Sequence, residues 1–149
     1  MNINELQIGD WVLENGERRT KIRGIVTGAS YEYENGVYVE DRYDIYHPGL
    51  FEGLRITPKF LTDNDFVQKH DMLEFSYKLE HDIGDGFMDT TIIKVWGYTK
   101  HYSDGRIEFN WKLDAPNVEG FKFQFVHELQ HALKLSKIKI EFKIDEYES

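Results

Sequence analysis

The sequence predicts an α+β fold in which antiparallel strands dominate and one helix lies near the C-terminus. Aromatic residues make up 15% of the 149 residues, and aromatic side chains favour strands over helices. Segments of alternating polar and apolar residues are separated by turn signals that contain Gly, Asn or Asp. We therefore expect an antiparallel, small-barrel-like N-terminal sheet, a short helix, an antiparallel meander, and a C-terminal helix followed by an edge strand.

The length of the chain fits one domain with a substantial core. No linker, internal repeat or low-complexity segment divides it. We expect a single domain over residues 1–149. The small-barrel-like part and the short helix would occupy residues 1–70, and the meander, the C-terminal helix and the last strand would occupy residues 71–149.

The N-terminal sheet is expected to open with a hairpin. Residues 6–13 read as a turn that enters a strand, and Asn15-Gly16 is a two-residue hairpin signal because both positions must adopt a positive φ. The partner strand should run from Arg19 to Thr27, with side chains alternating between two faces. An Ile-Gly-Asp opening before an apolar strand is similar to the start of small SH3-like barrels.

Residues 31–46 alternate tyrosine with acidic residues, which predicts a second hairpin that turns at Asn35-Gly36. This pattern is typical of a half-buried sheet with a solvated outer face, but it also fits an acidic-aromatic surface that meets a basic protein. Because Tyr38 and Tyr43 are an odd number of positions apart, they cannot both point inward on a regular strand. The candidate partner-binding residues are Tyr31, Tyr33, Tyr38, Tyr43, Glu32, Glu34, Glu40 and Trp11.

The middle of the chain changes from helical to alternating spacing. A short helix is expected near residues 62–70, because Thr62 is a natural N-cap and Asp65 completes a capping box. Its Phe66 and Val67 should cover the open side of the barrel. Strands are then expected over residues 72–79, 88–96 and 106–113, with turns at 82–86 and 103–105. The alternation of residues 138–144 predicts the final edge strand.

Residues 126–135 have helical spacing and contain the motif His127-Glu128-x-x-His131. On a helix, two histidines four residues apart lie on one face and can bind zinc, while the glutamate acts as a general base. A catalytic zinc needs a third protein ligand, and the glycine and third histidine of the extended motif are missing here. A zinc hydrolase is therefore the alternative hypothesis, not the leading one.

Three short segments occur in a characteristic order: Met-Asn-Ile-Asn-Glu-Leu-x-Ile-Gly at residues 1–9, Ile-x-Pro-x-x-Leu-Thr at 56–62, and Val-His-x-Leu-Gln at 126–130. Together they resemble a family of small proteins carried by phages and mobile elements of anaerobic gut bacteria. The family's last segment is similar to Val-His-Gln-Leu-Gln-Asn, so His127, Leu129 and Gln130 match, whereas Glu128 and His131 depart from it. The resemblance implies no particular activity, and it does not supply the residues that complete the zinc motif.

Composition narrows the classes of function. The chain carries 18 Lys and Arg against 27 Asp and Glu, a formal charge of −9, which argues against generic nucleic-acid binding. The absence of cysteine excludes disulfides, thiolate zinc sites and a cysteine nucleophile, and it fits a reducing cytoplasm. No segment approaches the ~20 apolar residues of a membrane span. We expect a soluble, cytoplasmic protein.

The leading functional hypothesis is a non-catalytic protein-binding or accessory module of a mobile element, with no cofactor and no metal, that uses the acidic-aromatic surface to bind a basic partner. The alternative is a zinc-dependent hydrolase in which His127 and His131 bind the metal and Glu128 is the base. A third hypothesis is a structural subunit of a larger assembly.

Overall fold

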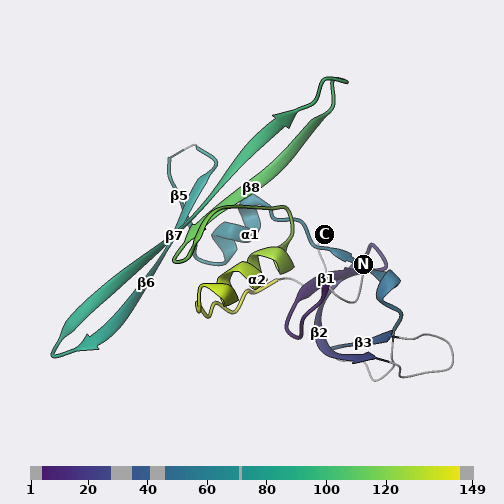
Figure 1. Ribbon diagram of the computed structural model, residues 1–149, viewed down its shortest axis with the longest axis horizontal. Coiled ribbons are helices and arrows are strands. Elements are labelled where there is room, and N and C mark those ends of the chain that lie inside the picture. The colour runs from purple at the N-terminus through teal and green to yellow at the C-terminus, as the bar shows by residue number, and fades with distance from the viewer. Residues whose placement is uncertain (1–4, 28–34, 41–45, 71, 145–149) are drawn as a thin grey trace. The chain divides into compact units, whose positions relative to one another are not determined.

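The computed structural model describes residues 5–27, 35–40, 46–70 and 72–144 (Figure 1). Its strands form two sheets in which neighbouring strands are antiparallel, and the α+β, strand-rich fold is confirmed. The chain divides into two compact units. The first unit contains residues 1–55, 125–127 and 144–149, and the second contains residues 56–124 and 128–143. The division therefore lies after Arg55 and not near residue 70, and the short helix belongs to the second unit.

The first unit contains a four-stranded sheet in the order β3-β2-β1-β4. The strands are β1 (Trp11–Glu14), β2 (Arg18–Thr27), β3 (Asn35–Val39) and β4 (Phe51–Gly53), and the 3-10 turn η2 (Pro48–Leu50) precedes β4. Asn15 and Gly16 connect β1 to β2 with φ angles of 52° and 71°. The hairpin predicted there is confirmed, because this turn needs two positive φ values.

The core of the first unit is built from inward-facing apolar residues of its strands. Tyr46 packs edge-on against Phe51, with ring centroids 6.4 Å apart. Residues 125–127 return to this unit, since the Val126 N–H donates to the Leu54 carbonyl at 2.7 Å. The buried cluster comprises Leu6, Val12, Ile22, Val37, Val39 and Phe51.

The hairpin predicted to turn at Asn35-Gly36 is wrong. Asn35 and Gly36 are the first residues of β3 and pair with Thr27 and Val26 of β2. Both residues therefore lie in a paired strand and not in a tight turn. Long-range pairing with β2 has overridden a local Asn-Gly turn signal.

The second unit contains a five-stranded meander in the order β5-β6-β7-β8-β9. The strands are β5 (Val67–Gln68), β6 (Glu74–Gly84), β7 (Phe87–His101), β8 (Ile107–Ala115) and β9 (Val118–Phe123). The predicted meander and both of its turns are confirmed. The buried residues of one sheet face include Phe75, Ile93, Val95, Trp111, Leu113 and Phe123.

The short helix α1 (Pro58–Asp63) begins earlier than predicted. Its N-cap is Thr57, whose Oγ1 accepts a hydrogen bond from the Phe60 N–H at 3.1 Å. Pro58 occupies the first helical turn, where a fixed φ is favourable and a missing N–H costs nothing. The prediction that Thr62 is the N-cap is therefore wrong. Thr62 lies inside the helix and its hydroxyl donates to the Pro58 carbonyl instead.

Helix α2 (Val126–Leu135) has the predicted bounds. Its apolar stripe of Val126, Leu129 and Leu133 is buried, as the 3.6-residue spacing requires.

The predicted C-terminal edge strand is absent from residues 138–144 as the structure describes them. The side-chain amide of Asn64 takes the place of a ladder partner: its Oδ1 accepts from the Lys143 N–H at 2.6 Å, and its Nδ2 donates to the Lys143 carbonyl at 3.0 Å. Ile138 and Phe142 are nevertheless buried. The alternation thus predicted the burial correctly and the pairing incorrectly.

Candidate functional site

Strand β7 is long enough to serve two hairpins that extend in opposite directions from the middle of the sheet (Figure 1). Its N-terminal half pairs only with β6, Lys94–Trp96 pair with both β6 and β8, and Gly97–His101 pair with β8. Strand β5 pairs with β6 only at Phe75 and Ser76. We call residues 78–92 the β6–β7 arm and residues 99–109 the β7–β8 arm.

The β6–β7 arm exposes large apolar side chains. Ile83 and Phe87 are each 67% exposed, Met88 is 55% exposed and Ile92 is 53% exposed. Since neighbouring residues of a strand point to opposite faces, Phe87 and Met88 place apolar groups on both faces of the ribbon. Neither face of this arm is therefore packed on a core.

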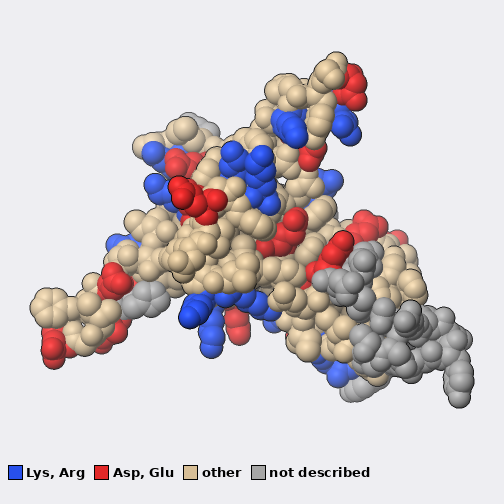
Figure 2. Space-filling model, in the orientation of Figure 1, with Lys and Arg blue, Asp and Glu red and all other residues tan. Residues whose placement is uncertain are grey.

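Acidic residues surround these apolar groups. Glu80, Asp82, Asp85 and Asp89 lie within the arm, against one basic residue, Lys78. The Lys78 Nζ is 3.4 Å from Glu80 Oε1, and both side chains are more than half exposed. Figure 2 shows carboxylates at the outer end of the arm among uncharged atoms. The arm is an acidic-apolar surface.

Hydrogen bonds and cation–π contacts between side chains stabilise the β7–β8 arm. The Tyr102 hydroxyl donates to Glu108 Oε2 at 2.6 Å, and the Tyr102 ring lies 4.1 Å from the Arg106 guanidinium carbon and 5.0 Å from Lys100 Nζ. Gln124 Nε2 donates to Glu108 Oε1 at 2.6 Å. The Tyr102 hydroxyl, assisted by further hydrogen bonds and by Lys100, lowers the pKa of Glu108, because these groups favour the ionised carboxylate.

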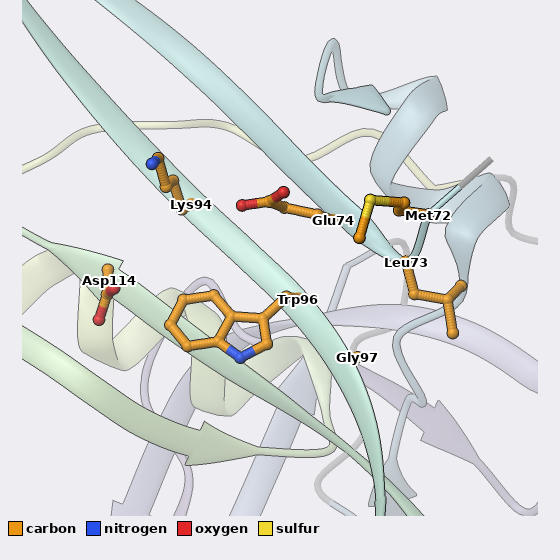
Figure 3. A pocket seen from close by; sticks show the side chains of 7 residues that line it. All are labelled: Met72, Leu73, Glu74, Lys94, Trp96, Gly97 and Asp114. Carbon is orange, nitrogen blue, oxygen red and sulfur yellow. The ribbon is translucent and has the colours of Figure 1, made fainter. Parts of the chain in front are cut away.

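An open hollow of about 380 Å³ lies on the outer face of the sheet, around the Trp96 indole. Figure 3 shows Lys94 and Asp114 toward one end of it and Met72 and Leu73 at the other. Its carboxylates already have partners, since Glu74 lies 3.5 Å from Lys69 Nζ and Asp114 accepts from the Gly120 N–H. The hollow thus offers aromatic and apolar contact beside the Lys94 amine. Its lining residues are Met72, Leu73, Glu74, Lys94, Trp96, Gly97 and Asp114.

The zinc motif lies at the start of α2. His127 is buried and its ring stacks on Phe125, with centroids 5.8 Å apart. Glu128 Oε1 accepts from the Gln124 N–H at 3.1 Å, so this carboxylate satisfies a backbone donor at the helix N-terminus. No group of three or more possible metal ligands occurs among the residues that the structure describes. The third ligand that a zinc hydrolase needs is thus missing from this part of the chain.

The predicted acidic-aromatic surface falls largely outside the described residues: Tyr31, Tyr33, Tyr43, Glu32 and Glu34 all lie there. Tyr38 is half-buried, and the Arg23 guanidinium carbon lies 5.2 Å from its ring centroid. Glu40 is also half-buried.

Trp11 does not fit that surface, because it is only 8% exposed. The indole of Trp11 belongs to the buried part of the first unit, with Lys21 Nζ 6.0 Å from its ring. An aromatic residue at the start of an apolar strand is more often core than contact surface.

The exposed apolar residues of the β6–β7 arm were not singled out from the sequence. The signal that could have identified them is strand length. β6 spans 11 residues and β7 spans 15, whereas an average strand has ~5–6. Strands this long extend past their neighbours in a small unit, and the overhanging residues cannot be buried in it.

No family model, no curated protein and no solved structure matches this chain. No helix in the described part of the chain is both long enough and apolar enough to cross a membrane.

Proposed function

We propose that this chain is a non-catalytic protein-binding module that contacts a basic protein through the β6–β7 arm. The observation that carries the proposal is the exposure of Ile83, Phe87, Met88 and Ile92 on a ribbon that no other described element covers. Large apolar side chains that cluster in solvent mark interaction sites more often than isolated ones do.

The energetics favour burial of this arm by a partner. Complete burial of one large apolar side chain contributes ~1.5–3 kcal/mol, so a partner that covers several of them gains a substantial part of its binding energy. An isolated two-stranded hairpin is only marginally stable in water. Contact with a partner would therefore also stabilise the arm itself.

The charge of the arm selects the partner. Four carboxylates lie among the apolar groups, and the chain has a formal charge of −9. A basic surface would be attracted and an acidic one repelled. The tyrosine-rich segment at residues 31–46 remains a second candidate contact, with the same preference for basic partners.

The resemblance of three segments to small proteins of phages and mobile elements implies no particular activity, so the proposal rests on the arm. This role requires neither a cofactor nor a metal.

A selection with displayed random peptides tests the proposal. We expect the enriched peptides to combine Lys or Arg with apolar residues. Their binding should fall at least about tenfold in a Phe87→Ser/Met88→Ser double variant. Ile107→Ser is the matched control, because Ile107 is 61% exposed on the other arm.

Salt provides a second readout. Charge attraction at an exposed surface is screened over ~10 Å at 0.1 M salt, so binding of the enriched peptides should weaken as salt is raised. Enrichment of acidic peptides, or binding that both arm variants retain, would contradict the proposal.

A further inference from the structure

The β6–β7 arm is a two-stranded ribbon, so each of its strands has one edge that no described strand covers. The register shows which residues direct their backbone groups to each edge. The Gly97 N–H donates to the Leu73 carbonyl at 2.8 Å, so Leu73 and Gly97 form a hydrogen-bonded pair. Such pairs alternate along an antiparallel ladder. The backbone N–H and C=O groups of odd-numbered residues therefore point toward the partner strand in both β6 and β7. The register Glu80↔Thr90 then directs the N–H and C=O groups of these two residues outward, to opposite edges of the ribbon.

Strand β8 would cover the outer edge of β7 if it continued. The β7–β8 ladder ends at Lys94↔Asp114, and β8 then turns into β9. The outward backbone groups of Met88, Thr90 and Ile92 lie past this end. No described strand pairs with them. The edge continues the line of β8 along β7, so an added strand would extend the ladder that β8 begins.

The two edges of the arm differ in the charge of the residues whose backbone groups point outward. On the β6 edge the outward residues are Lys78, Glu80 and Asp82, and charged side chains discourage edge pairing. On the β7 edge they are Met88, Thr90 and Ile92, which carry no charge and include the exposed apolar groups. β-branched residues also favour strand pairing. The β7 edge is thus the receptive one.

We propose that an extended basic-apolar segment of the partner adds to the β7 edge as an antiparallel strand, pairing with Met88, Thr90 and Ile92. This inference rests on the proposed function and specifies its geometry. Main-chain hydrogen bonds would supply affinity and alternate side chains would supply specificity.

The faces of the arm specify the chemistry of the added strand. On one face its side chains would lie beside Met88 and Ile92, and apolar residues fit there. On the other face they would lie beside Phe87, Asp89 and Thr91, where the charge of a lysine or arginine can pair with Asp89 and its methylene groups can pack on Phe87. The preferred segment therefore alternates apolar and basic residues.

A second copy of the chain is the less favourable occupant. Pairing two β7 edges would bring together two arms that each carry four carboxylates and one lysine, from chains with a formal charge of −9. Like charges at short range oppose that association. A basic segment meets no such repulsion.

The test uses a synthetic peptide of alternating lysine and valine, long enough to span residues 87–93, with the full-length protein. Its control is the same peptide N-methylated on two adjacent central residues, which keeps charge and apolar groups but removes donors on both edges. We expect the control to bind at least about tenfold more weakly. Amide hydrogen exchange should slow at Met88, Thr90 and Ile92, and not at Lys78, Glu80 and Asp82.

Two protein variants make the edge assignment independent of the peptide control. Thr90→Pro removes one outward N–H from the β7 edge, and Lys78→Pro removes one from the β6 edge. Proline is tolerated at such edge positions. Only Thr90→Pro should weaken peptide binding by about tenfold or more, with circular dichroism confirming that both variants fold.

The outcomes separate this inference from the proposed function. Equal binding of both peptides, still lost in Phe87→Ser/Met88→Ser, overturns strand addition and leaves the proposed function standing. Absence of binding by either peptide counts against both. A second copy would be the occupant if, without peptide, the protection of Met88, Thr90 and Ile92 from exchange grew with protein concentration and the protein sedimented as a dimer. That result overturns the proposal.

Discussion

The two arms of the second sheet share strand β7 and differ in how their side chains are held. In the β7–β8 arm, Tyr102 lies against two cationic side chains and donates to Glu108, which also accepts from Gln124. In the β6–β7 arm, the described side chains make one exposed ion pair, and Asp82 Oδ1 accepts a hydrogen bond from the Gly84 N–H. Both arms expose apolar side chains, Ile107 and Phe109 in one and Ile83, Phe87, Met88 and Ile92 in the other, but only the β7–β8 arm carries a side-chain network among the described residues.

Strand length alone therefore does not distinguish the proposed binding arm from the other arm. Both arms project beyond their neighbours (Figure 1), but in the β7–β8 arm Tyr102, Glu108 and two cationic side chains form a network. The β6–β7 arm lacks such a network among its described residues, and its exposed groups gain only when a partner covers them.

Trimming the β6–β7 arm tests the comparison most directly. Joining Leu79 to Thr91 through Asn-Gly removes the outer arm at a hydrogen-bonded pair, where a two-residue turn is favourable. We expect complete loss of peptide binding, while the free energy of unfolding in urea changes by less than about 1 kcal/mol. A large loss of stability would mean that the arm is structural.

The two histidines of α2 differ in how deeply their side chains are buried. His127 is buried against Phe125, whereas His131 is only half-buried. We expect His127→Ala to lower the free energy of unfolding by ~1–3 kcal/mol and His131→Ala to be near neutral. Chemical denaturation with and without zinc is the measurement. Equal losses that arise only with zinc would support the hydrolase alternative instead.

Tyr102→Ala and Phe87→Ala compare one aromatic residue from each arm. Removal of Tyr102 eliminates a charge-assisted hydrogen bond and two cation–π contacts, so we expect a loss of ~1–2 kcal/mol. Phe87 is 67% exposed, and its removal should change stability by less than about 0.5 kcal/mol. Urea unfolding of both variants checks this. Equal losses would remove the distinction between the arms.

The smallest expected effect concerns the ionisation of Glu108. Its pKa is lowered in the folded state, chiefly by the Tyr102 hydroxyl. Glu108 therefore contributes stability above its unfolded pKa, and this contribution is lost as pH falls through the folded pKa. Tyr102→Phe should raise the pKa of Glu108 toward its ordinary range and make stability less dependent on pH there. A carboxyl-carbon NMR titration in which the pKa stays unchanged would show that Tyr102 is not the cause.

Local signals in the sequence predicted much of the fold. The bounds of α2 follow from its apolar spacing, and the Asn15-Gly16 turn follows from the need for two positive φ angles. The same kind of signal failed at Asn35-Gly36, where pairing with β2 decides the conformation. It also misplaced the start of α1, since Thr57 and Pro58 form a stronger N-terminal signal than Thr62.

The candidate site was less accessible from sequence than the fold. The His-Glu-x-x-His pattern is visible in the sequence, but only the structure shows Glu128 bonded to the Gln124 amide. The alternation of residues 138–144 gives the correct burial, whereas Asn64, far away in sequence, decides that no ladder forms there.

By itself the sequence determined the strand-rich α+β class, the acidic charge, the turns of the meander and the apolar stripe of α2, because each depends on residues close together in the chain. Tertiary structure alone decided which strands overhang and hence which apolar residues stay exposed. The exposure of Phe87 and Met88 depends on where β5 and β8 stop pairing. That limit is set by contacts distant in sequence, which no local pattern encodes.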